Sequence, residues 1–303
     1  MLCVKLKRKD LGLFPRNLIN TDYEFVFLGD YVLVPVKERA EGYTIEECNP
    51  PRKEKGRKLR DLLPGVRSFV VIGDIALVSP KKDVDKAQLF QAIKQLEPRV
   101  RAVYIRRKVS GELRINMLEL AGGEPTTETV YKENGLLFYV DISKVYVNVT
   151  LASERAKLSR DICAEKPGKL LDAFTGYGPI AITVAKRGCY VVAGDLNLDG
   201  LYMAQKSARL NKVQHLDLVQ YDAHHLPFRD KAFDVTIADN PTKGHEFKDE
   251  ICRVSSKAVF YELARSEREA EEKIGKTKWL RVNEYSKDLF VFKGLITCDD
   301  ISS

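Results

Sequence analysis

The sequence lacks a long apolar run and lacks the close cysteine spacing of a metal site. Its longest apolar stretch, residues 69–78, is interrupted by Asp74 and is too short to cross a membrane. The first ten residues, MLCVKLKRKD, become charged too early for a secretory signal peptide. We therefore expect a cytoplasmic protein that does not associate with membranes.

Residues that commonly bind metals are few and far apart along the chain. The four histidines show no ligand spacing with cysteine, so the sequence predicts no metal site. The cysteines are too widely spread for a redox pair, and we expect reduced, mostly buried thiols of an intracellular protein. The six positions are Cys3, Cys48, Cys163, Cys189, Cys252 and Cys298.

The charge of the chain has a modest basic excess. There are 50 basic and 43 acidic residues, a net charge of +7, which is compatible with nucleic-acid binding without requiring it. The segment PRKEKGRKLR at residues 51–60 is either a solvated hinge or an arm that contacts phosphates. The candidates for phosphate contact, there and after a predicted strand at 100–105, are Arg52, Lys53, Arg57, Lys58, Arg106, Arg107 and Lys108.

The order of the predicted elements divides the chain into parts of different class. Short strand-like runs at 2–6 and 31–36 predict a small N-terminal domain over residues 1–48, followed by a basic linker at 49–62. A strand pair at 68–78, a helix at 85–96 and further strands predict a middle α+β domain over residues 63–140.

From residue 141 to residue 303 the pattern changes to strands that alternate with helices. This alternation predicts an α/β domain with a doubly wound, mostly parallel sheet, whose ligands bind at the carboxyl ends of the strands. The predicted helices are at 151–163, 179–187, 198–212, 244–254 and 266–275. The predicted strands are at 169–174, 189–194, 216–221, 233–238 and 257–262, with two paired strands at 279–283 and 289–296.

A glycine turn follows the first of these strands, in the segment LLDAFTGYGP at residues 170–179. Gly176-x-Gly178-x-x-Ala181 satisfies the dinucleotide pattern G-x-G-x-x-A, and Asp195 ends the next strand, where a ribose-binding acid is expected. Glycine lets the backbone approach a ligand closely, because it has no Cβ. The match alone does not separate a nicotinamide dinucleotide from S-adenosylmethionine.

Acids and amides at the other strand ends favour S-adenosylmethionine. Asp172 could accept a hydrogen bond from the amino group of a methionine moiety, and Asp222 could accept from the amino group of adenine. Asp239-Asn240-Pro241 closes the fourth strand, a common way to hold a planar nitrogen nucleophile beside a sulfonium methyl group. Each acid alone is more often a turn or cap residue, but their succession at strand ends predicts a methyl-donor site.

Several motifs in order along nearly the whole chain carry a family resemblance. They include IGDIAL (72–77), GELRINMLE (111–119), AGGEPTTETVYKENG (121–135), VDISKVYVNVTLASERAK (140–157), DAFTGYGP (172–179) and GDLNLDGL (194–201). With these the chain resembles the archaeal and eukaryotic-type tRNA (guanine-37-N1)-methyltransferases and the related wybutosine-pathway aminocarboxypropyltransferases. The resemblance implies a class I S-adenosylmethionine-dependent methyltransferase, with two smaller N-terminal domains that contact the tRNA.

The resemblance also implies roles for individual residues. Glu154 matches the general base that takes the N1 proton of guanine, and Arg114 matches the residue that supports charge on O6. Tyr146 matches an aromatic residue of the pocket, and Arg155 either orients Glu154 or contacts tRNA. The cofactor-binding residues implied are Asp172, Phe174, Gly176, Gly178, Asp195, Leu196, Asn197, Asp222 and Ala223.

Two departures from the family pattern lie where the target base is expected. Val147-Asn148-Val149-Thr150 stands where the family has a segment ending Pro-Arg, and Asp239-Asn240-Pro241 stands where it has Asn-x-Pro. Either Asp239 replaces the asparagine, or Asn240 takes its place in a shifted register.

These departures keep open the transfer of an aminocarboxypropyl group from the same cofactor and tRNA binding without catalysis. The glycine pattern taken alone also leaves a nicotinamide oxidoreductase as an alternative. Transfer from a sulfonium needs no metal, so this reaction implies none. Nothing in the sequence marks a self-association surface, and we therefore expect a monomer.

Overall fold

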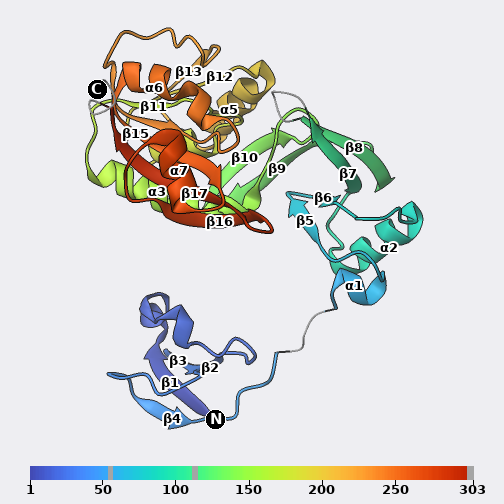
Figure 1. Ribbon diagram of the computed structural model, residues 1–303. Helices are drawn as coiled ribbons and strands as arrows, with labels where there is room; N and C mark the ends of the chain where they lie inside the picture. The colour runs from blue at the N-terminus through green and yellow to red at the C-terminus, as the bar shows by residue number, and fades with distance from the viewer. Residues whose placement is uncertain (54–56, 111–114, 299–303) are drawn as a thin grey trace. The chain divides into compact units, whose positions relative to one another are not determined.

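The computed structural model describes residues 1–53, 57–110 and 115–298 (Figure 1). It divides into two compact units, residues 1–57 and residues 58–303. Each unit is considered by itself below. Arg114, the predicted partner of guanine O6, lies outside the described residues.

The first unit is a small sheet of four strands in the order β2-β3-β1-β4. These are β1 (Leu2–Lys7), β2 (Val26–Leu28), β3 (Tyr31–Pro35) and β4 (Ile45–Glu47), with 3-10 turns at Arg8–Leu13 and Arg16–Leu18. Val4, Val32 and Val34 form its core with Phe14. Arg52 pairs with Tyr23 through an isolated antiparallel β-bridge, so the start of the predicted linker packs on this unit.

The second unit begins with a four-stranded sheet in the order β5-β6-β7-β8. Its strands are β5 (Phe69–Ile72), β6 (Ile75–Val78), β7 (Ala102–Ser110) and β8 (Ile115–Gly123), and its helices are α1 (Leu59–Leu62) and α2 (Lys86–Leu96). Apolar residues of α2 repeat at helical spacing, and Leu89 and Ile93 pack on the sheet beside the buried Leu59. The end of the predicted linker is therefore part of this folded core.

A hairpin of β9 (Glu128–Glu133) and β10 (Leu136–Asp141) follows. The backbone N–H groups of Leu137 and Tyr139 donate to Asn211 and Ser207, which lie at the end of α5 (Leu198–Leu210). The predicted boundary at residue 140 therefore falls at the end of a hairpin that packs on α5. The sequence analysis did not predict β9 as a strand, although this segment lies within the family motif at 121–135.

The described residues form a large sheet in the order β13-β12-β11-β14-β15-β17-β16. The parallel strands are β11 (Leu170–Asp172), β12 (Val191–Asp195), β13 (Leu216–Gln220), β14 (Phe233–Ala238) and β15 (Ser255–Ala264). The antiparallel strands β16 (Leu280–Ser286) and β17 (Leu289–Thr297) complete it. The further helices are α3 (Ala152–Ala164), α4 (Pro179–Ala185), α6 (Lys248–Val254) and α7 (Glu267–Ile274), with 3-10 turns at Val149–Leu151 and Gly244–Phe247.

This arrangement confirms the predicted doubly wound α/β fold and its paired tail strands (Figure 1). The strand order reverses at β11, which has β12 on one side and β14 on the other. Ligands of such sheets bind outside the carboxyl ends of the strands at this reversal. Among the described residues, no helix is both long and apolar enough to span a membrane.

The prediction of reduced cysteines is wrong for this structure, which pairs all six. The disulfides are Cys3–Cys48, Cys163–Cys189 and Cys252–Cys298, with sequence separations of 45, 26 and 46 residues. Partners so distant in sequence are brought together only by the fold, so close spacing could not reveal them. Each bond closes a loop within one unit and limits the freedom of the unfolded chain.

Candidate active site

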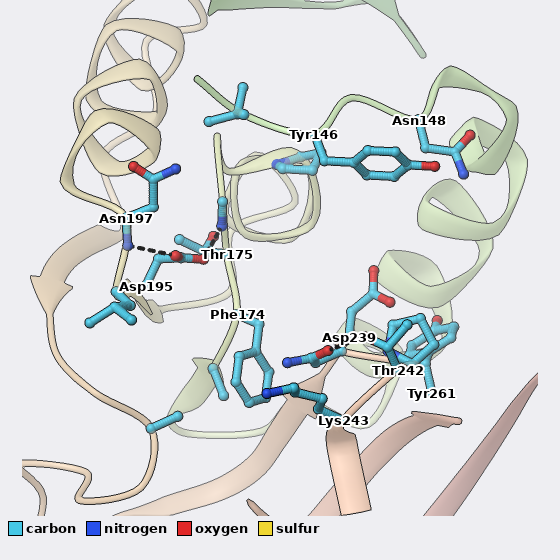
Figure 2. A pocket seen from close by; sticks show the side chains of 18 of the residues that line it. Tyr146, Asn148, Phe174, Thr175, Asp195, Asn197, Asp239, Thr242, Lys243 and Tyr261 are labelled. Carbon is cyan, nitrogen blue, oxygen red and sulfur yellow. Dashed lines mark hydrogen bonds between the residues drawn. The ribbon is translucent and has the colours of Figure 1, made fainter. Parts of the chain in front are cut away.

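A cavity of about 310 Å³ lies at the carboxyl ends of β11, β12 and β14 (Figure 2). It brings together most of the residues predicted from the strand ends. Those that line it are Tyr146, Arg155, Phe174, Gly176, Asp195, Leu196, Asn197, Asp222, Ala223, Asp239, Asn240 and Pro241. Asp172, Gly178 and Glu154 do not belong to its lining.

The glycine turn between β11 and α4 has two left-handed residues with different surroundings. Gly176 has φ +53°, and a Cβ there would meet no atom within 4 Å, so the turn leaves open space beside the backbone. Gly178 has φ +84°, and a Cβ there would lie 2.9 Å from Ala204 of α5. Gly176 therefore leaves room for a ligand, whereas Gly178 permits close packing of the helix.

Asp195, at the end of β12, is fixed in place by backbone groups. Its carboxylate accepts hydrogen bonds from Gly176 N at 2.7 Å and from Asn197 N at 2.8 Å. Burial raises the pKa of Asp195, against these backbone hydrogen bonds. Asn197 caps α5 by accepting from the N–H groups of Asp199 and Gly200, so its side chain shapes the cavity wall while holding the helix.

Asp172 lies beneath the glycine turn. Its Oδ2 accepts from the Thr175 hydroxyl at 2.9 Å and from Ala181 N at 3.1 Å, and its Oδ1 is buried without a hydrogen-bond partner. One carboxylate oxygen of Asp172 thus braces the glycine turn, and the predicted contact of this residue with a methionine amino group stays a prediction.

One wall of the cavity is aromatic, and the sequence analysis identified only part of it. The rings of Phe174 and Phe247 are 5.0 Å apart, and the ring of His224 is 4.7 Å from Phe247. His224 Nδ1 lies 2.6 Å from Asp222 Oδ1, and hydrogen bonds from His224 hold the pKa of Asp222 below its usual range. The sequence indicates His224 only as a residue of a loop, and Phe247 carries no sequence signal.

Across the cavity, Tyr146 and Asn148 lie on one side and Asp239, Thr242 and Tyr261 on the other (Figure 2). Burial raises the pKa of Tyr261 well above its usual range, and the nearby charge of Asp239 raises it further.

The loop after Asp239 is held by backbone bonds. Pro241 O accepts from Leu263 N at 2.7 Å, and Asn240 O accepts from Gly244 N at 2.7 Å. The first bond fixes this loop against β15, and the second joins it to the 3-10 turn at Gly244–Phe247.

Glu154 lies in the first turn of α3, joined to the cavity lining through Tyr261. The Tyr261 hydroxyl donates to Glu154 Oε1 at 2.9 Å, and Lys293 of β17 forms an ion pair with the same oxygen. The sequence gave no sign of either partner, because they are 107 and 139 residues away.

Comparison with known proteins identifies the family. Residues 129–288 match the model of the TRM5/TYW2 methyltransferase domain. The chain belongs to the TRM5/TYW2 methyltransferase family. The tRNA (guanine(37)-N(1))-methyltransferase Trm5b of Pyrococcus abyssi is 29% identical over 265 residues, which cover 81% of this chain and 78% of the relative.

Solved structures of this family share the fold. A complex of aTrm5 and tRNALeu superposes with a TM-score of 0.69 at 23% identity, covering 98% of this chain and 99% of the other. M. jannaschii TYW2 in complex with AdoMet superposes with a TM-score of 0.56 at 18% identity, covering 76% and 99%. At these identities the likeness establishes the fold alone.

In this TRM5/TYW2-type domain, Arg155 does not have the surface position expected of an RNA contact. It is 5% exposed, and its guanidinium donates to both carboxylate oxygens of Glu133, at 2.7 and 2.5 Å, and to Asn148 O at 2.9 Å. The guanidinium thus forms a buried ion pair that holds the loop before α3, and Arg155 also lines the cavity. Its contact with tRNA stays a prediction.

Some of the predicted phosphate-contacting residues are exposed, whereas others already form ion pairs or hydrogen bonds within the protein. Arg52, Lys53, Arg57 and Lys58 are exposed. Arg107 forms ion pairs with Glu119 and Asp83, and Arg106 donates to the Ser79 hydroxyl at 3.1 Å. The side chain of Lys108 lies outside the described part. Within the described ranges, no group of three or more potential ligand residues is placed to hold a metal ion.

Proposed function

We propose that this protein is an S-adenosylmethionine-dependent tRNA methyltransferase that methylates N1 of guanosine 37, beside the anticodon. Its membership in the TRM5/TYW2 methyltransferase family carries the proposal. The relatives named as tRNA (guanine(37)-N(1))-methyltransferases support the reaction, and the aTrm5 complex with tRNALeu supports tRNA as the partner. A monomer in the cytoplasm remains our expectation.

The cavity fits S-adenosylmethionine. Open space beside Gly176 permits close approach of the ligand, and Asp195 stands where a ribose hydroxyl would be held. Phe174, Leu196 and Ala223 offer apolar surface for an adenine ring, and Asp222 offers an acceptor for its amino group. A bound AdoMet in the related TYW2 structure supports this cofactor.

The chain's own residues divide the work of methyl transfer. Bound S-adenosylmethionine supplies a methyl group that N1 takes while the sulfur keeps the electron pair of the broken bond and becomes a thioether. Glu154 takes the N1 proton, and Arg114 supports the charge that develops on O6. Tyr146 and the Asp239 loop hold the guanine between them, on opposite sides of the cavity.

The decisive test is the identity of the modified nucleoside. Purified protein is incubated with S-adenosylmethionine and unmodified tRNA transcripts, and the digested product is analysed by mass spectrometry. We expect 1-methylguanosine at position 37. An aminocarboxypropyl adduct on a precursor tRNA would select the alternative reaction, and binding of tRNA with no adduct would select a non-catalytic homologue. Calorimetry with NADH tests the oxidoreductase, for which we expect no binding.

The role of Glu154 gives a sharper prediction. Glu154→Gln keeps the size of the side chain but removes the base, so we expect kcat to fall by about 10²- to 10⁴-fold. Binding of S-adenosylmethionine, measured by calorimetry, should stay unchanged because Glu154 does not line the cavity. The control is Glu165→Gln, a change at the exposed partner of Lys257. A kcat within twofold of the wild type would remove Glu154 from the mechanism.

A further inference from the structure

We propose that Lys293 is a positioning residue that orients Glu154 for proton transfer, an inference that rests on the proposed function. The sheet itself brings the residues together. Tyr261 of β15 and Lys293 of β17 are direct partners in the antiparallel register, so their side chains project from the same face. Both reach Oε1 of Glu154, which comes from α3.

The three side chains are shielded from solvent. The Lys293 side chain is 12% exposed and that of Glu154 is 18% exposed, while Tyr261 is 4% exposed. An ion pair in such a site is screened less than one on the surface, where paired long side chains contribute little. The contact therefore restricts the rotamer of Glu154 more strongly than an exposed lysine would.

The way the donors share the carboxylate suggests what this restriction does. Both bonds engage Oε1, and none of the hydrogen bonds described for this site involves Oε2. One oxygen is thus anchored by the sheet, and the other is left for the substrate.

Other charged groups nearby do not hold Glu154 in the same way. Lys157 of α3 is close enough to Glu154 to interact electrostatically but is paired with Asp161 at 2.5 Å. Lys293 also interacts electrostatically with Asp161, and Asp239 interacts electrostatically with Tyr261. Arg155, the next residue, is committed to Glu133. Lys293 is the cation whose ion pair with Glu154 the structure describes.

The experiment compares Lys293→Met and Lys293→Arg in the full chain, with steady-state kinetics on a tRNA transcript. We expect Lys293→Met to lower kcat by about 10- to 100-fold, the range that corresponds to a hydrogen bond between charged groups. KM for S-adenosylmethionine and for tRNA should stay within about twofold, since Lys293 is outside the cavity lining. Lys293→Arg should restore most of kcat.

The matched control is Lys257→Met, which breaks an exposed lysine–glutamate contact of β15. We expect wild-type kinetics from it. A Lys293→Met protein with wild-type kcat, or with KM raised and kcat kept, would overturn the positioning role. The role would equally be overturned if Lys293→Arg were as slow as Lys293→Met, because the charge would then not be what matters.

A double-mutant cycle separates this inference from the proposed function. If Lys293 acts through Glu154, adding Lys293→Met to Glu154→Gln should lower kcat no further, whereas independent effects would multiply and overturn the inference. Urea unfolding of the same four proteins measures the coupling of the pair without any activity. If the wild-type protein makes no methylguanosine, the proposed function is overturned, and the role of Lys293 in catalysis is overturned with it. Absent coupling in unfolding shows separately that Lys293 does not engage Glu154.

Discussion

At the scale of single residues, Asp172 combines burial with an acceptor oxygen that has no partner. Burial raises its pKa from an ordinary value of 3.8 to about 7, despite the hydrogen bonds from Thr175 and Ala181. The unfolded chain therefore releases this proton at lower pH than the folded protein does. The contribution of Asp172 to stability is fully present below about pH 4 and is lost as the pH rises to about 7.

Asp172→Asn should remove this dependence. The amide oxygen can still accept from Thr175 and Ala181, so the variant should gain stability relative to wild type between pH 4 and 7, by at most about 4 kcal/mol. Above pH 7 the difference should stay constant. Urea unfolding at several pH values measures it. The control is Asp161→Asn, since Lys157 lowers the pKa of that exposed carboxyl and its effect lies below this window. Parallel curves for wild type and Asp172→Asn would contradict the prediction.

Also at this scale, the sequence predicted the residues at strand ends and missed those that β15 and β17 place beside Glu154. Asp195, Asp222 and Asp239 were predictable because carboxyl ends of parallel strands meet at one edge. Tyr261 and Lys293 were not, because strand register across the sheet decides which side chains reach Glu154.

At the scale of elements, β9 shows why the alternation of apolar and polar residues did not predict every strand. Its buried face carries Thr129, Tyr131 and Glu133, whereas Val130 points outward and is 43% exposed. A charged residue occupies an inward position because Arg155 of α3 neutralises it. A pattern that counts apolar residues cannot find a strand whose buried face is polar.

The Arg155–Glu133 pair joins β9 to α3, so its loss should be costly. Arg155→Met leaves Glu133 buried without its partner, and we expect a loss of about 3–5 kcal/mol of stability. The double variant Arg155→Met/Glu133→Met should recover part of this, because it leaves no unpaired charge. Urea unfolding measures both. On the same helix, Lys157→Met breaks an exposed pair and should cost less than about 1 kcal/mol. Losses that simply add in the double variant would contradict this account.

At the scale of the whole molecule, composition predicted the class of the chain but not its covalent structure. The doubly wound sheet was predictable because strands and helices alternate clearly after residue 141. The disulfides were not, since each pairs cysteines at least 26 residues apart. The end of the predicted linker at 49–62 also belongs to a folded core, because Leu59 is buried beside α2. The polar composition of this segment gave no indication that one of its residues is buried.

The exposed cations of this segment lead to a prediction about the full protein and tRNA. A variant that neutralises them should bind tRNA more weakly and with a flatter dependence on salt, because fewer counterions are released. The logarithmic salt slope should fall by about 0.7–0.9 for each phosphate that the protein no longer neutralises. Binding of S-adenosylmethionine should not change. The changes to glutamine are at Arg52, Lys53, Arg57 and Lys58.

A control of equal charge distinguishes contact from a general effect of net charge. It neutralises four exposed lysines of the second unit that carry no predicted role, namely Lys166, Lys212, Lys276 and Lys278. Filter binding at several salt concentrations gives both slopes. If the segment contacts phosphates, only the first variant flattens the slope. Equal slopes in the two variants would mean that the segment is a solvated hinge, and that the modest net charge of the chain acts on tRNA as a whole.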